Sequence, residues 1–142
     1  VENIRYLAEL AGVKVIQSDI KDVLLRTGIT EAQLERKIGS FSKGMRQKVA
    51  ISFALLKHAK LVLMDEPTSG LDPVATQEFI EVVNTIKQRG TAVLIVTHDL
   101  LCAHQLADQI GIMSHGQLKQ LIKNDDLTLP DLTEQYFEQF SA

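Results

Sequence analysis

Two adjacent carboxylates, Asp65 and Glu66, are the residues of this chain whose types and position could do chemistry. They follow the apolar run Leu-Val-Leu-Met at 61–64, which predicts a strand buried on both faces. In open α/β sheets, ligands bind beyond the carboxyl ends of the strands. Because adjacent strand residues point to opposite faces, one acid could lie near a metal ion while the other faces an attacking water. Pro67 ends the strand, since proline has no N–H to donate. A strand that ends in a solvated acidic turn is the alternative interpretation.

A second apolar run, at 92–96, also ends in a polar group, because His98 follows it after a single threonine. A lone histidine is more often structural than catalytic, but this position matches that of the two acids and favours a functional histidine. The other histidines have no comparable setting and are expected to be structural: His58, His104 and His115.

A helix start that contains serine and glycine lies upstream of both runs, at residues 41–47. Ser42 is a suitable N-cap, and the unpaired amides at a helix N-terminus form an anion site. A plain capped helix would explain Ser42 equally well.

The order of these three motifs resembles the ATP-binding-cassette (ABC) ATPases, and the resemblance covers nearly the whole chain. By that resemblance, Asp65 is the Walker B aspartate that holds Mg²⁺, Glu66 is the catalytic general base and His98 is the switch histidine. The resemblance implies a P-loop NTPase fold of the ABC type and ATP and Mg²⁺ as cofactors. It also implies a second ATPase subunit and transmembrane permease subunits as partners, on the cytoplasmic face of a membrane.

The same resemblance makes Ser42-Lys43-Gly44 the signature motif, which faces the ATP held by the second subunit. The pattern departs from the usual Leu-Ser-Gly-Gly-Gln, because Phe41, Lys43 and Met45 replace the Leu, the first Gly and the Gln. Lys43 would add positive charge near the phosphates, and similar variants occur in bacterial exporter-type ATPases.

Asp72 ends the segment 69–72, Ser-Gly-Leu-Asp, which the resemblance identifies as the D-loop. Two interpretations of Asp72 are compatible. It would cap the helix that begins at Pro73, and in the family it would contact the partner subunit near its active site.

The phosphate-binding loop of these ATPases, G-x-x-x-x-G-K-[ST], does not occur in the 142 residues. Gly39 and Gly44 have the glycine spacing, but Met45 follows where lysine is required. Residues 1–7 look like the helix that follows the family's Q-loop. We therefore expect the chain to be the C-terminal part of an ABC ATPase subunit that lacks the phosphate-binding loop and Q-loop.

The composition is that of an ordinary globular chain, with 45% hydrophobic and 23% charged residues. A net charge of −3 gives no electrostatic reason to expect a nucleic-acid partner. The single cysteine, Cys102, cannot form an internal disulfide and is expected to be a half-buried helix residue. The longest wholly apolar run is 92–96, far shorter than the roughly 20 residues that a membrane-spanning helix needs.

Hydrophobic periodicity predicts an α/β fold in which a helical subdomain precedes part of a mainly parallel sheet flanked by helices. The helical, signature-motif part is expected at 1–58, and the C-terminal part of the ATPase core at 59–142. Helices are expected near 4–11, 16–25, 30–37, 42–57, 73–89 and 133–140, and strands at 61–65, 92–97, about 109–113 and about 117–121. The residues expected to face the core are Val49, Ala50, Phe53, Leu56, Phe79, Val82, Val83, Ile86, Leu132, Tyr136, Phe137 and Phe140.

The phosphate-loop strand of these ATPases lies between the strand that ends before His98 and the strand near Ile110. Without it, buried N–H and C=O groups would lose their partners, which is costly. We therefore expect strand 109–113 to pair directly with 92–97, or a second copy to fill the gap, while strands 61–65 and 92–97 remain neighbours.

Two other functions remain open at this point. One is a non-transport cassette, as in DNA repair or translation. The repair type inserts a long coiled coil, whereas here only residues 48–64 separate the signature region from Asp65. The other is a non-catalytic interaction module that presents the signature face to a complete partner.

We expect that these 142 residues alone neither hydrolyse ATP nor bind it tightly, because Asp65 and Glu66 cannot replace the amides and lysine of a phosphate loop. Calorimetric titration of the purified chain with ATP tests this. Micromolar binding would contradict the expectation, because it corresponds to about 8 kcal/mol with no visible source.

Overall fold

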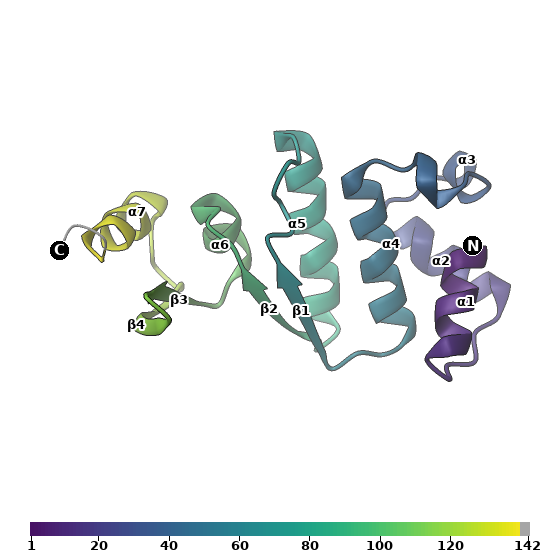
Figure 1. Ribbon diagram of the computed structural model, residues 1–142, viewed down its shortest axis with the longest axis horizontal. Helices are drawn as coiled ribbons and strands as arrows, with labels where there is room; N and C mark the ends of the chain where they lie inside the picture. Colours follow the sequence, from purple (N-terminus) through teal and green to yellow (C-terminus); the bar gives the residue numbers. More distant parts are fainter. Residues whose placement is uncertain (140–142) are drawn as a thin grey trace. The chain divides into compact units, whose positions relative to one another are not determined.

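The computed structural model describes residues 1–139, and the chain divides into two compact units, Val1–Val96 and one that begins at Thr97. Helices occupy the first part, and from Leu61 onward strands are interspersed with helices (Figure 1). The α/β class expected from the sequence is confirmed. The boundary that the sequence predicts after residue 58 falls between the last of these helices and the first strand. That it separates two domains stays a prediction.

The helices before the first strand lie close to their expected positions. Gly12 and Gly28 follow the first two helices with φ values of +67° and +82°, a conformation that glycine adopts without strain. Thr30 and Gln33 form a capping box at the third helix, because each side chain bonds the other's backbone. The elements are α1 (Glu2–Leu10), α2 (Gln17–Arg26), α3 (Glu31–Leu34), the 3₁₀ turn η1 (Ile38–Ser40) and α4 (Lys43–Leu56).

Helix α4 packs against α1 and α2 and also against α5 (Pro73–Gln88), so it is buried along two sides. Val49 and Leu56 are buried as expected, but Ala50 is exposed, which corrects that part of the sequence prediction. Its place is taken by Ile51 and Ser52, because a helix held between two neighbours buries more than one stripe. Ser52 is buried, and its hydroxyl has a hydrogen-bond partner in the hydroxyl of Thr27, at 2.6 Å.

Strands β1 (Leu61–Asp65) and β2 (Ala92–Val96) form a parallel pair, with Leu61 opposite Ala92 and Asp65 opposite Val96. Helix α5 makes the crossover that a parallel pair requires. All four of its expected core residues are buried: Phe79, Val82, Val83 and Ile86. The prediction that 61–65 and 92–97 remain neighbours is confirmed.

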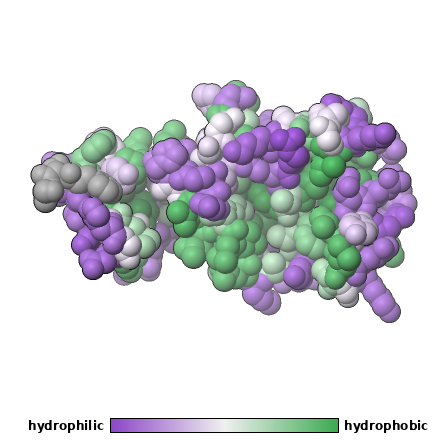
Figure 2. Space-filling model, viewed as in Figure 1, coloured by the Kyte–Doolittle hydropathy of each residue, from purple (hydrophilic) through white to green (hydrophobic). Residues whose placement is uncertain are grey.

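One face of this strand pair is open, so the expectation that 61–64 is buried on both faces is wrong. Leu61, Leu63, Leu94 and Val96 alternate with half-buried residues and are 55–67% exposed. Figure 2 shows hydrophobic surface over β1 and β2. The apolar run indicates strands that could be covered on two sides, but one set of alternate side chains is exposed here and the other is half-buried.

The second unit contains α6 (Leu100–Leu106), β3 (Gln109–Ser114), β4 (Gln117–Lys123) and α7 (Leu129–Glu138). Strands β3 and β4 form an antiparallel hairpin whose turn is His115-Gly116, with φ values of +51° and +74°. Two positive φ angles suit the tight turns that join antiparallel strands. Within the second unit, β3 pairs with β4 in the described residues, and the expected pairing of 109–113 with 92–97 stays a prediction. The other possibility, a second copy in the gap, stays a prediction as well.

Helix α7 begins four residues before the expected Thr133, because Thr128 and Asp131 form a capping box and Pro130 occupies the first turn. Leu132 is fully buried as expected, whereas Phe137 is exposed and so does not face the core. The expectation for Phe140 lies outside the described residues. Cys102, expected to be half-buried, is completely buried in α6.

None of the helices in the part of the chain that the structure describes is long and apolar enough to span a membrane.

We expect Ile86→Ala to lower the free energy of unfolding by about 2–5 kcal/mol, because it empties a buried position in α5. Val74→Ala in the same helix is the matched control, since Val74 is 70% exposed and should change stability by less than about 0.5 kcal/mol. Urea unfolding of the intact protein measures both, and equal effects would contradict the packing described for α5.

Candidate functional site

Asp65 is the last residue of β1, and its backbone lies opposite Val96 at the end of the parallel ladder. Its side chain is exposed and, by strand alternation, lies on the open face with Leu61 and Leu63. Glu66 follows it and is partly buried, so the two carboxylates have different surroundings.

The backbone of Glu66 is in the left-handed region, with φ of +44°. Its N–H donates to the carbonyl of Val96 at 2.8 Å, which continues the ladder by one bond while the chain already turns. A non-glycine residue held in this region costs about 1–3 kcal/mol and commonly marks a functional site. This strain was not expected from the sequence, since no residue type announces it.

The chain from Glu66 to Asp72, called the acid loop below, consists of two consecutive turns. The N–H of Ser69 donates to the carbonyl of Glu66 at 3.2 Å, and that of Leu71 donates to the carbonyl of Thr68 at 3.0 Å. Pro67 and Thr68 are buried, and Gly70 has a φ of +70°. The loop is therefore anchored at its middle as well as at its ends.

Asp72 ends the acid loop as the N-cap of α5, as expected, with a 2.8 Å bond from the N–H of Ala75 to its carboxylate. Pro73 occupies the first turn. The cap consumes one carboxylate lone pair and leaves the other oxygen available, so a second contact from Asp72 is chemically possible.

Ser42 is the N-cap of α4, also as expected, and its hydroxyl accepts from the N–H of Met45 at 3.2 Å. A hydroxyl that accepts this bond still has its own proton to donate to an anion. Gly44 lies in the first turn, where an added Cβ would be 3.6 Å from the Cβ of Ala75, so the position is close to α5 without demanding glycine.

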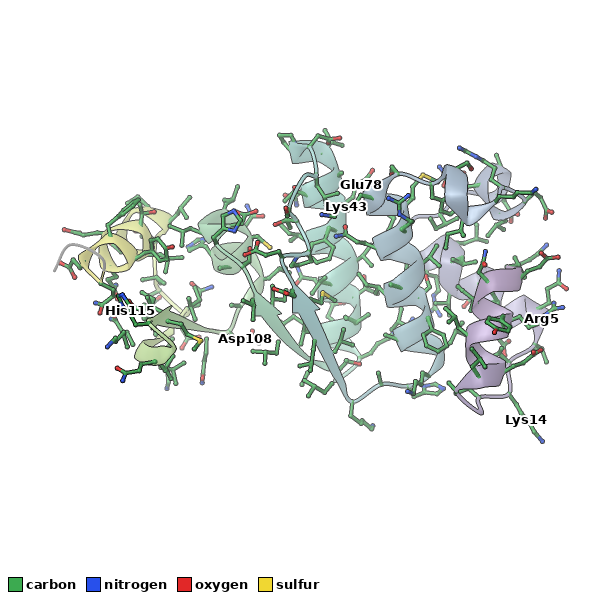
Figure 3. The ribbon with its side chains drawn as sticks, in the orientation of Figure 1. Arg5, Lys14, Lys43, Glu78, Asp108 and His115 are labelled. Atoms are coloured by element: carbon green, nitrogen blue, oxygen red, sulfur yellow. The ribbon has the colours of Figure 1, made fainter. Side chains whose placement is uncertain are left out.

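The side chain of Lys43 donates to the carbonyl of Ser69 in the acid loop, and that of Gln47 donates to the carbonyl of Pro67. The structure thus brings the expected signature residues of α4 together with the expected D-loop. Figure 3 shows Lys43 at the boundary between α4 and α5. Sequence reasoning missed Gln47, although its spacing of four from Lys43 was a signal that both side chains leave one face of a helix.

His98 lies between β2 and α6, in the unit that begins at Thr97, and its side chain is exposed. It is two residues beyond Val96, the strand partner of Asp65. The structure does not place it relative to Glu66. Asp99 caps α6, with a 3.0 Å bond from the N–H of Cys102.

The residues present fit Mg²⁺ together with a nucleotide rather than a metal cage. Within residues 1–139, no group of three or more His, Cys, Asp or Glu side chains could hold an ion. Mg²⁺ is usually held by one or two carboxylates, waters and substrate phosphates, and the exposed Asp65 at a strand end suits such a set.

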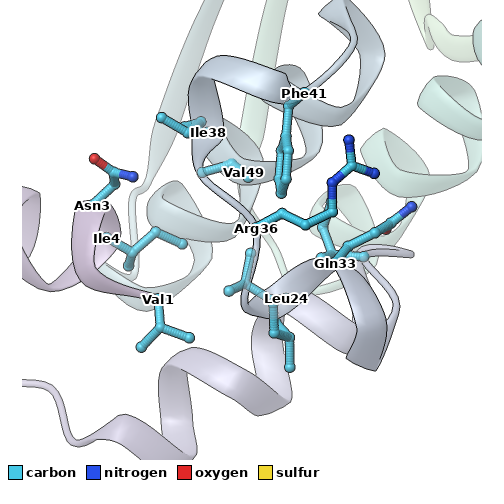
Figure 4. A pocket seen from close by; sticks show the side chains of 11 residues that line it. Val1, Asn3, Ile4, Leu24, Gln33, Arg36, Ile38, Phe41 and Val49 are labelled. Atoms are coloured by element: carbon cyan, nitrogen blue, oxygen red, sulfur yellow. The ribbon is translucent and has the colours of Figure 1, made fainter.

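A small hollow lies among the helices of the first unit, with a volume of about 20 Å³. This is room for roughly one water, so it does not hold a nucleotide. Arg36 lies over the ring of Phe41 at 5.9 Å on its rim (Figure 4). A second hollow of about 100 Å³ is bordered by His58, Lys60 and Arg89, and neither is lined by the acid-loop residues.

Comparisons with known proteins show which proteins the whole chain resembles. A family model described as "AAA domain, putative AbiEii toxin, Type IV TA system" matches residues 3–102. The chain is 35% identical over 119 residues to the "Uncharacterized ABC transporter ATP-binding protein YdbJ" of Bacillus subtilis (strain 168), which covers 83% of this chain and 38% of that protein.

Two solved structures share the fold. "Structure of ATP binding subunit of ABC transporter" matches with 30% identity and a TM-score of 0.71, over 96% of this chain and 61% of that one. "Dimeric structure of a post-hydrolysis state of the ATP-binding cassette MJ0796 bound to ADP and Pi" matches with 24% identity and a TM-score of 0.65, over 78% and 47% of the two chains.

The chain therefore belongs to the AAA-domain family of that model and, through these relatives and its fold, to the ABC ATPases. The family resemblance seen in its motifs is confirmed. The chain spans 38% to 50% of the length of the first curated relatives that it matches.

The strain at Glu66 predicts that Glu66→Gly is more stable than Glu66→Ala by about 1–2 kcal/mol, because only alanine pays for the left-handed backbone. Both variants remove the same carboxylate, so its contacts cancel in the comparison. Unfolding in urea measures the difference.

Glu81 in the interior of α5 provides the opposite control, since glycine there should be less stable than alanine by about 0.5–1 kcal/mol. A Glu66→Ala variant more stable than Glu66→Gly would contradict the left-handed backbone conformation at Glu66.

Proposed function

We propose that the protein is the ATP-hydrolysing subunit of an ABC transporter, in which ATP binding and hydrolysis at a dimer interface are coupled to transport. The observation that carries the proposal is the position of the two acids. Asp65 and Glu66 stand at the end of β1, and the acid loop that begins at Glu66 is bonded to the first turns of α4. Membership of the ABC ATPases supports it.

Asp65 would hold Mg²⁺ through its exposed carboxylate. Bound Mg²⁺ would supply charge neutralisation on the phosphates of ATP, which phosphoryl transfer needs more than covalent help. Glu66 would act as the general base that accepts a proton from the attacking water. Its strained turn and its ladder bond to Val96 would keep that carboxylate at a defined position beside Asp65.

Ser42, Lys43 and Gly44 form the N-terminal turn of α4, where unpaired amides and the helix dipole favour an anion. In the intact assembly this turn would face the ATP held by a second ATPase subunit, with the Ser42 hydroxyl donating to a phosphate. Asp72 would contact that subunit with the carboxylate oxygen that the cap leaves available. A cassette of the same fold has a dimeric structure bound to ADP and Pi, which motivates the dimeric part of the proposal.

His98 would hydrogen-bond the γ-phosphate and report its presence. The other partners would be transmembrane permease subunits, with the protein bound to the cytoplasmic face of the membrane, and the Ser-Lys-Gly-Met variant favours an exporter-like system. The 142 residues alone are proposed to be inactive, because none of them supplies a phosphate-binding loop.

In the intact protein, Glu66→Gln should reduce the turnover number for ATP by about 10²–10⁴-fold while leaving ATP binding intact, since glutamine keeps the shape but cannot accept a proton. Asp65→Asn should instead weaken the Mg²⁺-dependent part of binding. Steady-state hydrolysis and calorimetry with and without Mg²⁺ measure these effects.

Glu81→Gln, an exposed change of the same type in α5, should leave turnover unchanged. Turnover in Glu66→Gln within a few-fold of the wild type would show that Glu66 is not the base.

A further inference from the structure

Two side chains of α4 bond directly to backbone carbonyls of the acid loop. Lys43 donates through Nζ to the carbonyl of Ser69, and Gln47 donates through Nε2 to the carbonyl of Pro67. The donors are one helical turn apart and leave the same face of α4. The acceptors are two residues apart in the loop, so the two bonds run side by side.

Packing extends the same line of contact from the loop into α5. At Gly44, between the two donors, an added Cβ would lie 3.7 Å from Leu71 Cδ2 and 3.6 Å from the Cβ of Ala75. One position beyond Gln47, Lys48 pairs with Glu78 of α5 at 2.8 Å. The two hydrogen bonds are therefore the loop end of a continuous contact between α4 and the segment 67–78.

Lys43 is an unfavourable residue for its local position, because a cation in the first turn of a helix meets the positive end of the helix dipole. A residue that breaks a local rule is expected where function or a compensating contact retains it. Here the compensating contact is the electronegative carbonyl of Ser69, to which the ammonium group donates.

Gln47 is half-buried, and its acceptor belongs to the buried Pro67. Its second amide atom, Oε1, is buried and has no hydrogen-bond partner in the part of the chain that the structure describes. A buried amide with one orphaned atom is costly. The cost of the orphaned Oε1 would be avoided by an apolar side chain, so the bond from Nε2 to Pro67 is the contact that explains why an amide stands here.

We infer that Lys43 and Gln47 are positioning residues that hold the acid loop against the signature turn of α4, so that Glu66 and Ser42 keep a fixed geometry. The catalytic part of this inference rests on the proposed function, and the structural part does not. By this inference, the ammonium group of Lys43 bonds the acid loop of its own chain rather than a phosphate of ATP.

Amide hydrogen exchange in the intact protein tests the structural part. The reporters are the N–H groups of Glu66, Ser69 and Leu71, each of which is hydrogen-bonded within or beside the loop. Lys43→Met and Gln47→Met keep the side-chain length and remove the donors. Each should speed exchange at these amides by about tenfold, the size expected for a lost hydrogen bond to an ordered group.

Lys43→Arg restores a cationic donor and should return exchange toward the wild-type rate. Lys57→Met is the matched control, because Lys57 is an exposed lysine at the opposite end of α4. Unchanged exchange in both methionine variants at positions 43 and 47 would overturn the inference, as would an equal effect of Lys57→Met.

Steady-state ATP hydrolysis separates the two roles for Lys43. A positioning role predicts that Lys43→Met lowers kcat by roughly tenfold with little change in KM, since small misplacements of catalytic groups are costly. A direct phosphate contact made equally in the ground state predicts a raised KM with kcat preserved and loop exchange unchanged, and that outcome would overturn the inference.

Absence of ATP hydrolysis in the wild-type protein would overturn the proposed function alone. In that case the exchange rates of the three loop amides would still decide whether Lys43 and Gln47 hold the loop.

Discussion

The hydrogen bond from the N–H of Glu66 to the carbonyl of Val96 is the interaction on which the arrangement of the site depends. The parallel ladder of β1 and β2 ends at Asp65, and this one further bond holds the backbone of Glu66 to the sheet while the chain reverses. The reversal forces the left-handed conformation at Glu66. It also separates the two carboxylates, leaving Asp65 exposed on the open face and Glu66 partly buried.

The rest of the acid loop is stabilised by ordinary local interactions, which offset the free-energy cost of that strained turn. Two backbone hydrogen bonds close its turns, Thr68 within it is buried, and Asp72 ends it as the N-cap of α5. After the loop, α5 buries its apolar residues between Phe79 and Ile86. Strain of about 1–3 kcal/mol is tolerable where a rigid core over-determines the backbone.

Helix α4 joins the two halves of the candidate site because it is buried on two sides. One side packs on α1 and α2, where Thr27 and Ser52 share a hydrogen bond, and the other side packs on α5. Its first turn therefore cannot shift without disturbing both neighbours. This is the physical basis for treating Ser42, the cap of α4, and the acid loop as one body within the first unit.

Much of the site could be predicted from local sequence because the relevant interactions are local. Caps at Ser42 and Asp72, the strands that end at Asp65 and Val96, and the pairing of those strands follow from residue type, periodicity and the family resemblance. Tertiary structure decided the rest. The left-handed turn at Glu66 results from a ladder bond to a residue thirty positions away, and the bonds of Lys43 and Gln47 depend on where α4 meets the loop. The exposed face of β1 and β2 was misjudged for the same reason, since an apolar run reports that a strand can be buried and only its neighbours determine whether it is.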